Sequence, residues 1–169
     1  APASYSIGFA AEGYDEMAYA RIAAKRFGTE HHEHYVTPED LLEGILEEGA
    51  RFAESVLAPT NRVGDEHGLR FEAGQVFTPP GFKEAYKRYC EDGWITMTAD
   101  PQWGGQGLPA GFALAFSEML LSGNMAWKMY SGLTESAALT IQSHGTEELK
   151  QRYLPKMVSG EWAGTMCLT

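Results

Sequence analysis

The hydrophobic pattern of this chain changes its period at Thr37 and Pro38, and that change limits the fold more than any other feature. Before it, SYSIGF (4–9) and HEHYVT (32–37) are short segments with strand character, and they flank the helical segment MAYARIAAKRFG (17–28). A strand, a helix and a second strand in so few residues predict a βαβ unit. The parallel strands of such a unit need neighbours to cover their edges and faces.

After this point the pattern predicts helices. Thr37 suits an N-cap, Pro38 suits the first helical position, and an apolar stripe leads toward Pro59, made of Leu41, Leu42, Ile45, Phe52, Val56 and Leu57. The polar stretch NRVGDEHG (61–68) predicts a loop. RFEAGQVF (70–77) predicts a small hairpin around Ala73 and Gly74.

The second half continues as a predicted helical bundle. GFKEAYKRYCEDG (81–93) is amphipathic, with Phe82, Tyr86, Tyr89 and Cys90 on one side, and WITMTA (94–99) predicts a short extended piece. Two strongly apolar helices follow, residues 111–124 and 126–145. Thr146 caps a further helix that Pro155 should break or kink, and residues 159–169 alternate as a strand does. The fold class expected is therefore mainly α, with a βαβ segment at the start and one strand at the end.

Composition excludes several classes of function. The chain has 23 acidic and 13 basic residues and a formal net charge of -10, which disfavours nucleic acid and anionic lipid as partners. Cys90 and Cys167 fit neither a disulfide scaffold nor a zinc site. No run of eighteen apolar residues occurs and the first residues lack the basic start of a signal peptide, so we expect a cytoplasmic protein without a membrane partner. The chain opens on Ala1, which suggests processing, trimming or a piece of a longer protein.

Three candidate sites have simpler interpretations. His31, His32 and His34 in EHHEHY could seat a transition metal, but no HExxH or further ligand accompanies them, so we interpret them as surface residues. GQGLPA (105–110) matches the loose dinucleotide form GxGxxA, yet Pro109 and the lack of a preceding strand favour a packed glycine-rich turn. Glu118 on an apolar helix is more typical of a bundle acid than of a catalytic one. We therefore assign no catalytic and no metal-binding residue.

The order of segments in residues 41–169 resembles the acyl-CoA dehydrogenase family. GWITMTADPQWGGQG, the apolar helices and HGTEELKQRYLPKMVSGEWAGTMCLT carry the resemblance, and residues 45–68 and 78–94 resemble the branch that includes 3-methylmercaptopropionyl-CoA dehydrogenase. The resemblance implies an N-terminal helical domain, FAD as cofactor and α,β-dehydrogenation of an acyl-CoA substrate. It places Met166, Leu168 and Thr169 on the strand beside the flavin ring.

In that family the catalytic glutamate lies in a C-terminal helical domain that this sequence does not contain. We therefore expect the chain to hold a partial FAD site and to be inactive alone. The family's N-terminal domain forms one wall of the acyl and flavin cavity, so MYSGLTES (129–136) is a candidate lining, with Gly132 and Leu133 as candidate substrate-binding residues. The resemblance leaves the acyl chain, the electron-transfer partner and the oligomeric state open, a homo-oligomer included.

Residues 4–40 resemble a different family, the synthetase domain of glutamine-dependent asparagine synthetases. The SIGF strand, the YDE..YAR..A helix and GTEHHE..VTPED carry this resemblance, while the ATP-binding SGGxDS loop is absent from the sequence. We expect a fusion, with parts at 1–37, 38–160 and 161–169. The alternatives are part of an ATP-dependent amide ligase, or a non-catalytic interaction module whose strand edges associate.

Overall fold

The computed structural model describes residues 1–9 and 16–165, except for the side chain of Phe9. These residues form two compact units, Ala1–Glu47 and Glu48–Thr169, and the division falls inside a helix. The division at 47 and 48 lies later than the change of sequence pattern at Thr37, because helix α2 (Pro38–Phe52) begins in the first unit and ends in the second.

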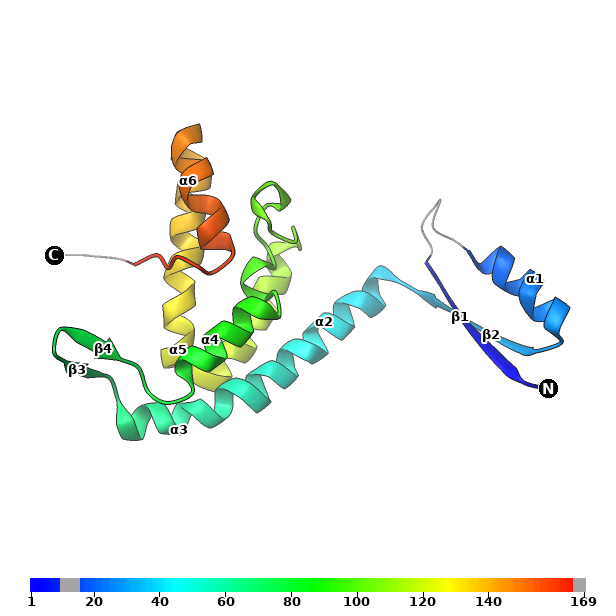
Figure 1. The fold of residues 1–169 in the computed structure, drawn as a ribbon, viewed down its shortest axis with the longest axis horizontal. Helices are drawn as coiled ribbons and strands as arrows, with labels where there is room; N and C mark the ends of the chain where they lie inside the picture. Colours follow the sequence, from blue (N-terminus) through cyan, green and yellow to red (C-terminus); the bar gives the residue numbers. More distant parts are fainter. Residues whose placement is uncertain (10–15, 166–169) are drawn as a thin grey trace. The chain divides into compact units, whose positions relative to one another are not determined.

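The first unit is the expected βαβ segment. Strand β1 (Ala3–Phe9) and strand β2 (Glu30–Val36) pair in parallel, with Ala3 opposite Glu30 and Phe9 opposite Val36, and helix α1 (Met17–Phe27) connects them (Figure 1). Gly28 ends α1 in the left-handed conformation, as its position predicts (φ 64°). Met17 and Ala24 are the buried residues of α1. Its apolar series at 18, 22, 23 and 27 instead faces solvent, with Ile22 65% and Phe27 75% exposed.

Helix α2 continues through a π-helical turn, η1 (Ala53–Leu57), into α3 (Ala58–His67). In the π turn the N–H of Ala58 donates to the carbonyl of Ala53, five residues earlier, and this shifts the hydrogen-bond register of the helix. The shift occurs just before Pro59, which has no N–H to donate and whose ring would clash with a carbonyl of a regular α-helix. The loop predicted for residues 61–68 is therefore wrong. Gly64 lies so close to the Phe82 ring that a Cβ would stand 2.9 Å from Phe82 Cζ, so tertiary packing holds α3 in place.

The hairpin expected around Ala73 and Gly74 is confirmed by β3 (Arg70–Glu72) and β4 (Gln75–Phe77), which pair antiparallel across two residues of positive φ. Helix α4 (Phe82–Glu91) follows. The extended piece predicted at 94–99 is wrong, because Trp94–Thr96 form a 3₁₀ turn (η2) and a second one (η3) spans Pro101–Trp103. The glycines after η3 pack on this segment, since a Cβ on Gly105 would lie 1.9 Å from the carbonyl oxygen of Ala99.

The long helix α5 (Ala110–His144) is two helices joined at Asn124, as the sequence predicts. Asn124 has extended backbone angles (φ −157°, ψ 95°), and its side-chain oxygen accepts the N–H of Trp127 at 2.9 Å, which is an N-cap inside the helix. Its amide nitrogen donates to Thr60 Oγ1 at 2.8 Å, so the bend is tied to α3. Asn124 and Thr60 are both buried.

Helix α6 (Glu147–Val158) begins at the predicted N-cap Thr146, whose hydroxyl accepts the N–H of Leu149. Pro155 does not break it, and α6 continues to Val158. The bundle core of the second unit is aromatic, because Phe52, Tyr89, Phe116 and Trp127 are all buried. Tyr89 lies 5.4 to 6.4 Å from each of the other three rings, centroid to centroid. No strand is assigned in residues 161–165, and the remainder of the predicted final strand lies outside the described residues.

Candidate functional site

A cavity of about 460 Å³ lies in the second unit between α4, α5 and the segment Ala163–Thr165. Its volume falls in the range of small-molecule sites, roughly 300–1,000 Å³. Apolar and aromatic side chains dominate its wall, and the described residues contribute no carboxylate to the lining. The lining residues are Thr78, Phe82, Lys83, Tyr86, Lys87, Trp127, Met129, Tyr130, Leu133, Ala163, Gly164 and Thr165.

The polar atoms of two wall residues are already bonded to the backbone. Trp127 Nε1 donates to the carbonyl of Phe82 at 3.1 Å, and the Tyr86 hydroxyl donates to the carbonyl of Gly160 at 3.2 Å. Phe82 in turn meets Tyr130 edge to face, with ring centroids 6.2 Å apart. The rings of Trp127, Tyr86 and Phe82 therefore present apolar surface to the cavity. Two lysines, Lys83 and Lys87, supply the positive charge of the described lining.

The segment after α6 forms one side of the cavity and is fixed to α5. In Figure 1 this segment, in red, turns back from α6 toward α5. The N–H of Gly164 donates to the buried Thr134 hydroxyl at 3.0 Å, and a Cβ on Gly164 would stand 2.8 Å from the Ala137 Cβ. Only glycine allows so close an approach. Gly164 therefore lies against α5 next to Leu133, whose carbonyl oxygen would stand 3.0 Å from the same Cβ.

A partly buried ion pair lies on helix α5. Lys128, whose side chain is 8% exposed, donates to Glu135 Oε1 at 2.9 Å, and Ser131 Oγ lies 3.4 Å from the same ammonium. The Tyr89 hydroxyl stands 3.5 Å from Glu135 Oε1. Burial and the Glu135 charge raise the pKa of the Tyr89 hydroxyl well above its usual value, and burial raises the pKa of Tyr86 to about 12.

This raised pKa of Tyr89 predicts a loss of stability in alkali. Above pH 10 the unfolded chain releases the Tyr89 proton while the folded chain keeps it, so the free energy of unfolding should fall by about 1.4 kcal/mol per pH unit for this group. Urea denaturation between about pH 9 and pH 12 measures the slope. Tyr89→Phe should reduce it, whereas Tyr19→Phe, at an exposed position, should not; equal slopes in all three proteins would contradict the prediction.

The structure brings one predicted substrate residue into this cavity. Leu133 lines it, whereas the adjacent Gly132 does not, and a Cβ built on Gly132 would meet no atom within 4 Å. The predicted cofactor residues Met166, Leu168 and Thr169 lie outside the described residues. The aromatic residues of the cavity wall were not predicted from the sequence to belong to a site. The amphipathic spacing of Phe82 and Tyr86 was the available signal, but it indicated a core face equally well.

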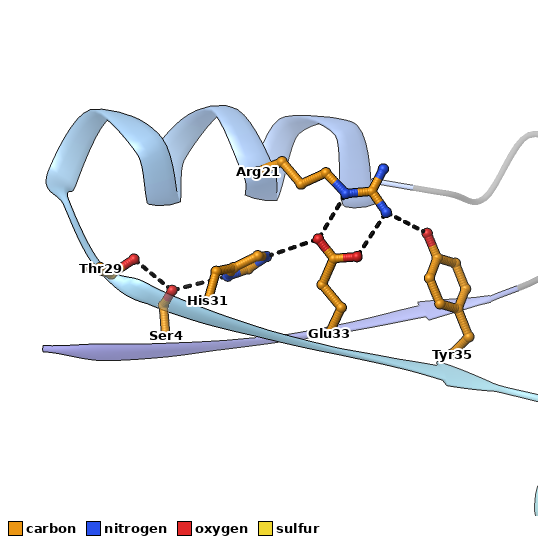
Figure 2. A network of polar contacts seen from close by, with 6 residues as sticks. All are labelled: Ser4, Arg21, Thr29, His31, Glu33 and Tyr35. Atoms are coloured by element: carbon orange, nitrogen blue, oxygen red, sulfur yellow. Dashed lines mark hydrogen bonds and ion pairs between the residues drawn. The ribbon is translucent and has the colours of Figure 1, made fainter.

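His31, one of the three histidines of EHHEHY, belongs to a polar network in the first unit (Figure 2). His31 Nδ1 and the Ser4 hydroxyl are 3.0 Å apart, and Arg21 binds Glu33 through two hydrogen bonds of 2.7 Å, which hold the pKa of Glu33 below its usual value. His31 Nε2 is buried without a hydrogen-bond partner among the described residues, although Glu33 Oε1 lies 3.5 Å away. In residues 1–9 and 16–165, no group of three His, Cys, Asp or Glu side chains is placed to hold a metal ion.

Two known protein families match this chain. Residues 39–161 match the acyl-CoA dehydrogenase N-terminal domain, and residues 2–63 match asparagine synthase. Both matches agree with the resemblances found in the sequence, and they overlap within α2, η1 and α3. None of the helices in the described part of the chain has the length and apolar character needed to cross a membrane.

Individual relatives agree with the larger match. 3-Methylmercaptopropionyl-CoA dehydrogenase of Ruegeria pomeroyi is 36% identical over 124 residues, 73% of this chain and 21% of that protein. A butyryl-CoA dehydrogenase of Syntrophomonas wolfei is 37% identical over 133 residues, 77% of this chain and 22% of that protein. The chain thus spans about a fifth of the length of these curated relatives.

A solved structure shows the same fold. A chain of the ChsE4-ChsE5 complex from Mycobacterium tuberculosis matches with a TM-score of 0.55 and 23% identity over 75% of this chain and 29% of that chain. The helical bundle, the match over residues 39–161 and the relatives above 30% identity all lead to one assignment. This chain belongs to the acyl-CoA dehydrogenase family, of which it carries the N-terminal domain.

Proposed function

We propose that this chain forms the N-terminal part of an FAD-dependent enzyme that oxidises acyl-CoA thioesters between Cα and Cβ, and that the cavity between α4 and α5 receives the acyl chain. The observation that carries the proposal is the wall itself. Its aromatic rings have their polar atoms bonded to backbone carbonyls, and the predicted substrate residue Leu133 lies among them. Burial of an apolar acyl chain against these rings is favourable, because it removes apolar surface from water.

The cofactor proposal rests on the segment at the edge of this cavity. Ala163–Thr165 line the cavity, and Gly164 is fixed to Thr134, so Thr165, the residue before Met166, lies beside the proposed acyl site. Met166, Leu168 and Thr169 would bind the flavin. Bound FAD would supply the hydride acceptor. The apolar lining suits the acyl group rather than the polar edge of the flavin, so we expect only a partial FAD site.

The same lining supports the proposal that the chain alone is inactive. Removing the α-proton of a thioester requires a base within hydrogen-bond reach, and none of the described residues places a carboxylate or histidine in the cavity wall. We therefore propose that the general base comes from another part of the complete enzyme. A site that holds the acyl chain without the base should bind substrate and not turn it over.

Equilibrium dialysis tests the acyl site. We expect the chain to retain octanoyl-CoA, to bind FAD weakly, and to form no enoyl product. Leu133→Arg should weaken octanoyl-CoA binding at least tenfold, because it places a charge in the apolar wall, a loss of about 1.4 kcal/mol or more. Leu114→Arg is the matched control on the same helix, since Leu114 is 74% exposed and does not line the cavity. Equal binding by both variants would refute the acyl site.

A second candidate function rests on the match of residues 2–63 to asparagine synthase and on the parallel β1–α1–β2 unit. It makes the chain part of an ATP-dependent amide ligase, whereas the dehydrogenase proposal treats the same segment as one part of a natural or recombinant fusion. Dialysis of the same protein against ATP separates the candidates. Retention of ATP without octanoyl-CoA would favour the ligase, and the reverse result would favour the dehydrogenase.

A further inference from the structure

The first unit has a strand edge that its own described residues do not use. Strand β1 pairs only with β2 within residues 1–9 and 16–165, so one edge of β1 carries backbone N–H and C=O groups without a strand partner. Parallel strands are normally flanked by further strands and covered on both faces. Unpaired edges of this kind are templates for another chain.

The two faces of the sheet differ. Helix α1 covers the face that carries Ser4, Ser6 and Gly8, because a Cβ on Gly8 would stand 2.6 Å from Met17 Cγ, and Figure 2 shows α1 along this face. Tyr5 and Ile7 point to the opposite face and are 77% and 67% exposed. Tyr5 stacks on His32 of β2, with ring centroids 5.0 Å apart. A further strand added beside β1 would extend this apolar row.

The two edges also differ in charge. Strand β1, ASYSIGF, has no charged side chain, whereas β2, EHHEHYV, carries two glutamates and three histidines. Charged residues on an edge strand discourage pairing with another copy, and β1 lacks this protection. The edge of β1 is therefore the one open to association.

The sequence of β1 is close to self-complementary about Ser6. If two copies of β1 lie antiparallel with Ser6 opposite Ser6, Tyr5 of each copy stands opposite Ile7 of the other on the exposed face. Aromatic and β-branched residues are favourable cross-strand partners. A two-fold axis normal to the sheet relates the copies, so both α1 helices lie on one face and both Tyr5–Ile7 rows on the other.

We propose that the free edge of β1 is a homodimer interface in which two copies of this chain pair antiparallel about Ser6. The result is a four-stranded sheet in the order β2, β1, β1, β2. One pair of strands buries less than the roughly 1,200 Å² of a stable interface, so the dimer is transient. Two chains of net charge -10 also repel, so association should increase with ionic strength.

Sedimentation equilibrium in about 0.15 M and about 0.5 M salt tests the interface. The weight-average mass should rise from 18.6 kDa toward twice that value as concentration increases, more so at the higher salt. Tyr5→Lys and Ile7→Glu each alter both cross-strand pairs of a homodimer, so each should weaken self-association about tenfold. Tyr19→Lys, at a position of α1 that is 75% exposed, should leave association unchanged.

A mixture of the Tyr5→Lys and Ile7→Glu variants tests the register. In the mixed dimer the introduced lysine of one chain faces the introduced glutamate of the other, while the remaining Ile7–Tyr5 pair is native, so association should recover to at least the wild-type level. Far-ultraviolet circular dichroism checks that both variants keep their fold. A monomer at every concentration, or a dimer that neither variant weakens, would overturn the interface. Failure of the mixture to recover would overturn the antiparallel register about Ser6.

Discussion

Replacing Trp127 with alanine should lower the free energy of unfolding by about 3–5 kcal/mol, measured by urea denaturation of the second unit. Trp127 is 2% exposed, and its ring lies within 6.4 Å of the rings of Phe52, Tyr86 and Tyr89. Alanine would leave a cavity at the centre of this aromatic cluster and remove the partner of the Phe82 carbonyl. Close-packed surroundings can fill such a space only in part.

Two controls separate the contributions of ring volume and hydrogen bonding. Trp127→Phe keeps most of the ring volume but loses the Nε1 hydrogen bond, so its loss should be smaller than that of alanine. Trp162→Ala removes the same side chain from a position that is 37% exposed and should cost about 1 kcal/mol or less. A loss below about 1 kcal/mol for Trp127→Ala would show that α4 and α5 do not enclose this ring.

Asn124→Leu should cost about 2–4 kcal/mol in the same measurement, the second largest effect we expect. Leucine removes the oxygen that caps the second half of α5, and leaving the buried N–H of Trp127 without this acceptor costs about 1–3 kcal/mol. It also removes the donor to Thr60, a second buried hydrogen bond that adds about 1 kcal/mol.

Asn124→Ser and Asn61→Leu are the controls for this bend. Serine can still cap the N–H of Trp127, so it should recover part of the loss. Asn61 is exposed on α3, and leucine there should change stability by about 0.5 kcal/mol or less. Equal stabilities of Asn124→Leu and Asn61→Leu would contradict a structural role for the amide.

Short-range signals predicted several boundaries in this chain. Thr37 and Thr146 cap their helices through hydroxyl groups that accept the N–H three residues later, and the Ala73–Gly74 pair turns a hairpin. These features depend on residues within a few positions of one another, so sequence suffices. The loop predicted for residues 61–68 is wrong because the π turn accommodates Pro59 and the contact between Gly64 and Phe82 stabilises the helix beyond it.

The candidate site, too, could be predicted only in part from the sequence. Leu133 was predicted through a family resemblance, and the cavity includes it. The aromatic wall was not predicted, since the same spacing of apolar residues fits a core face. Which rings turn toward a cavity depends on the backbone carbonyls that accept the Trp127 and Tyr86 donors, and those carbonyls belong to residues 45 and 74 positions away.

By itself, then, the sequence determined the helix caps, the break at Asn124, the parallel βαβ unit and the family of the larger part, because each is encoded by local hydrogen bonding or by a contiguous motif. Only the tertiary structure decided the path of the chain through Pro59, the solvent exposure of the apolar side of α1 and the enclosure of a cavity by α4, α5 and Ala163–Thr165. Those features depend on contacts between residues distant in sequence. A local sequence pattern does not specify which apolar face of a helix another part of the chain will bury.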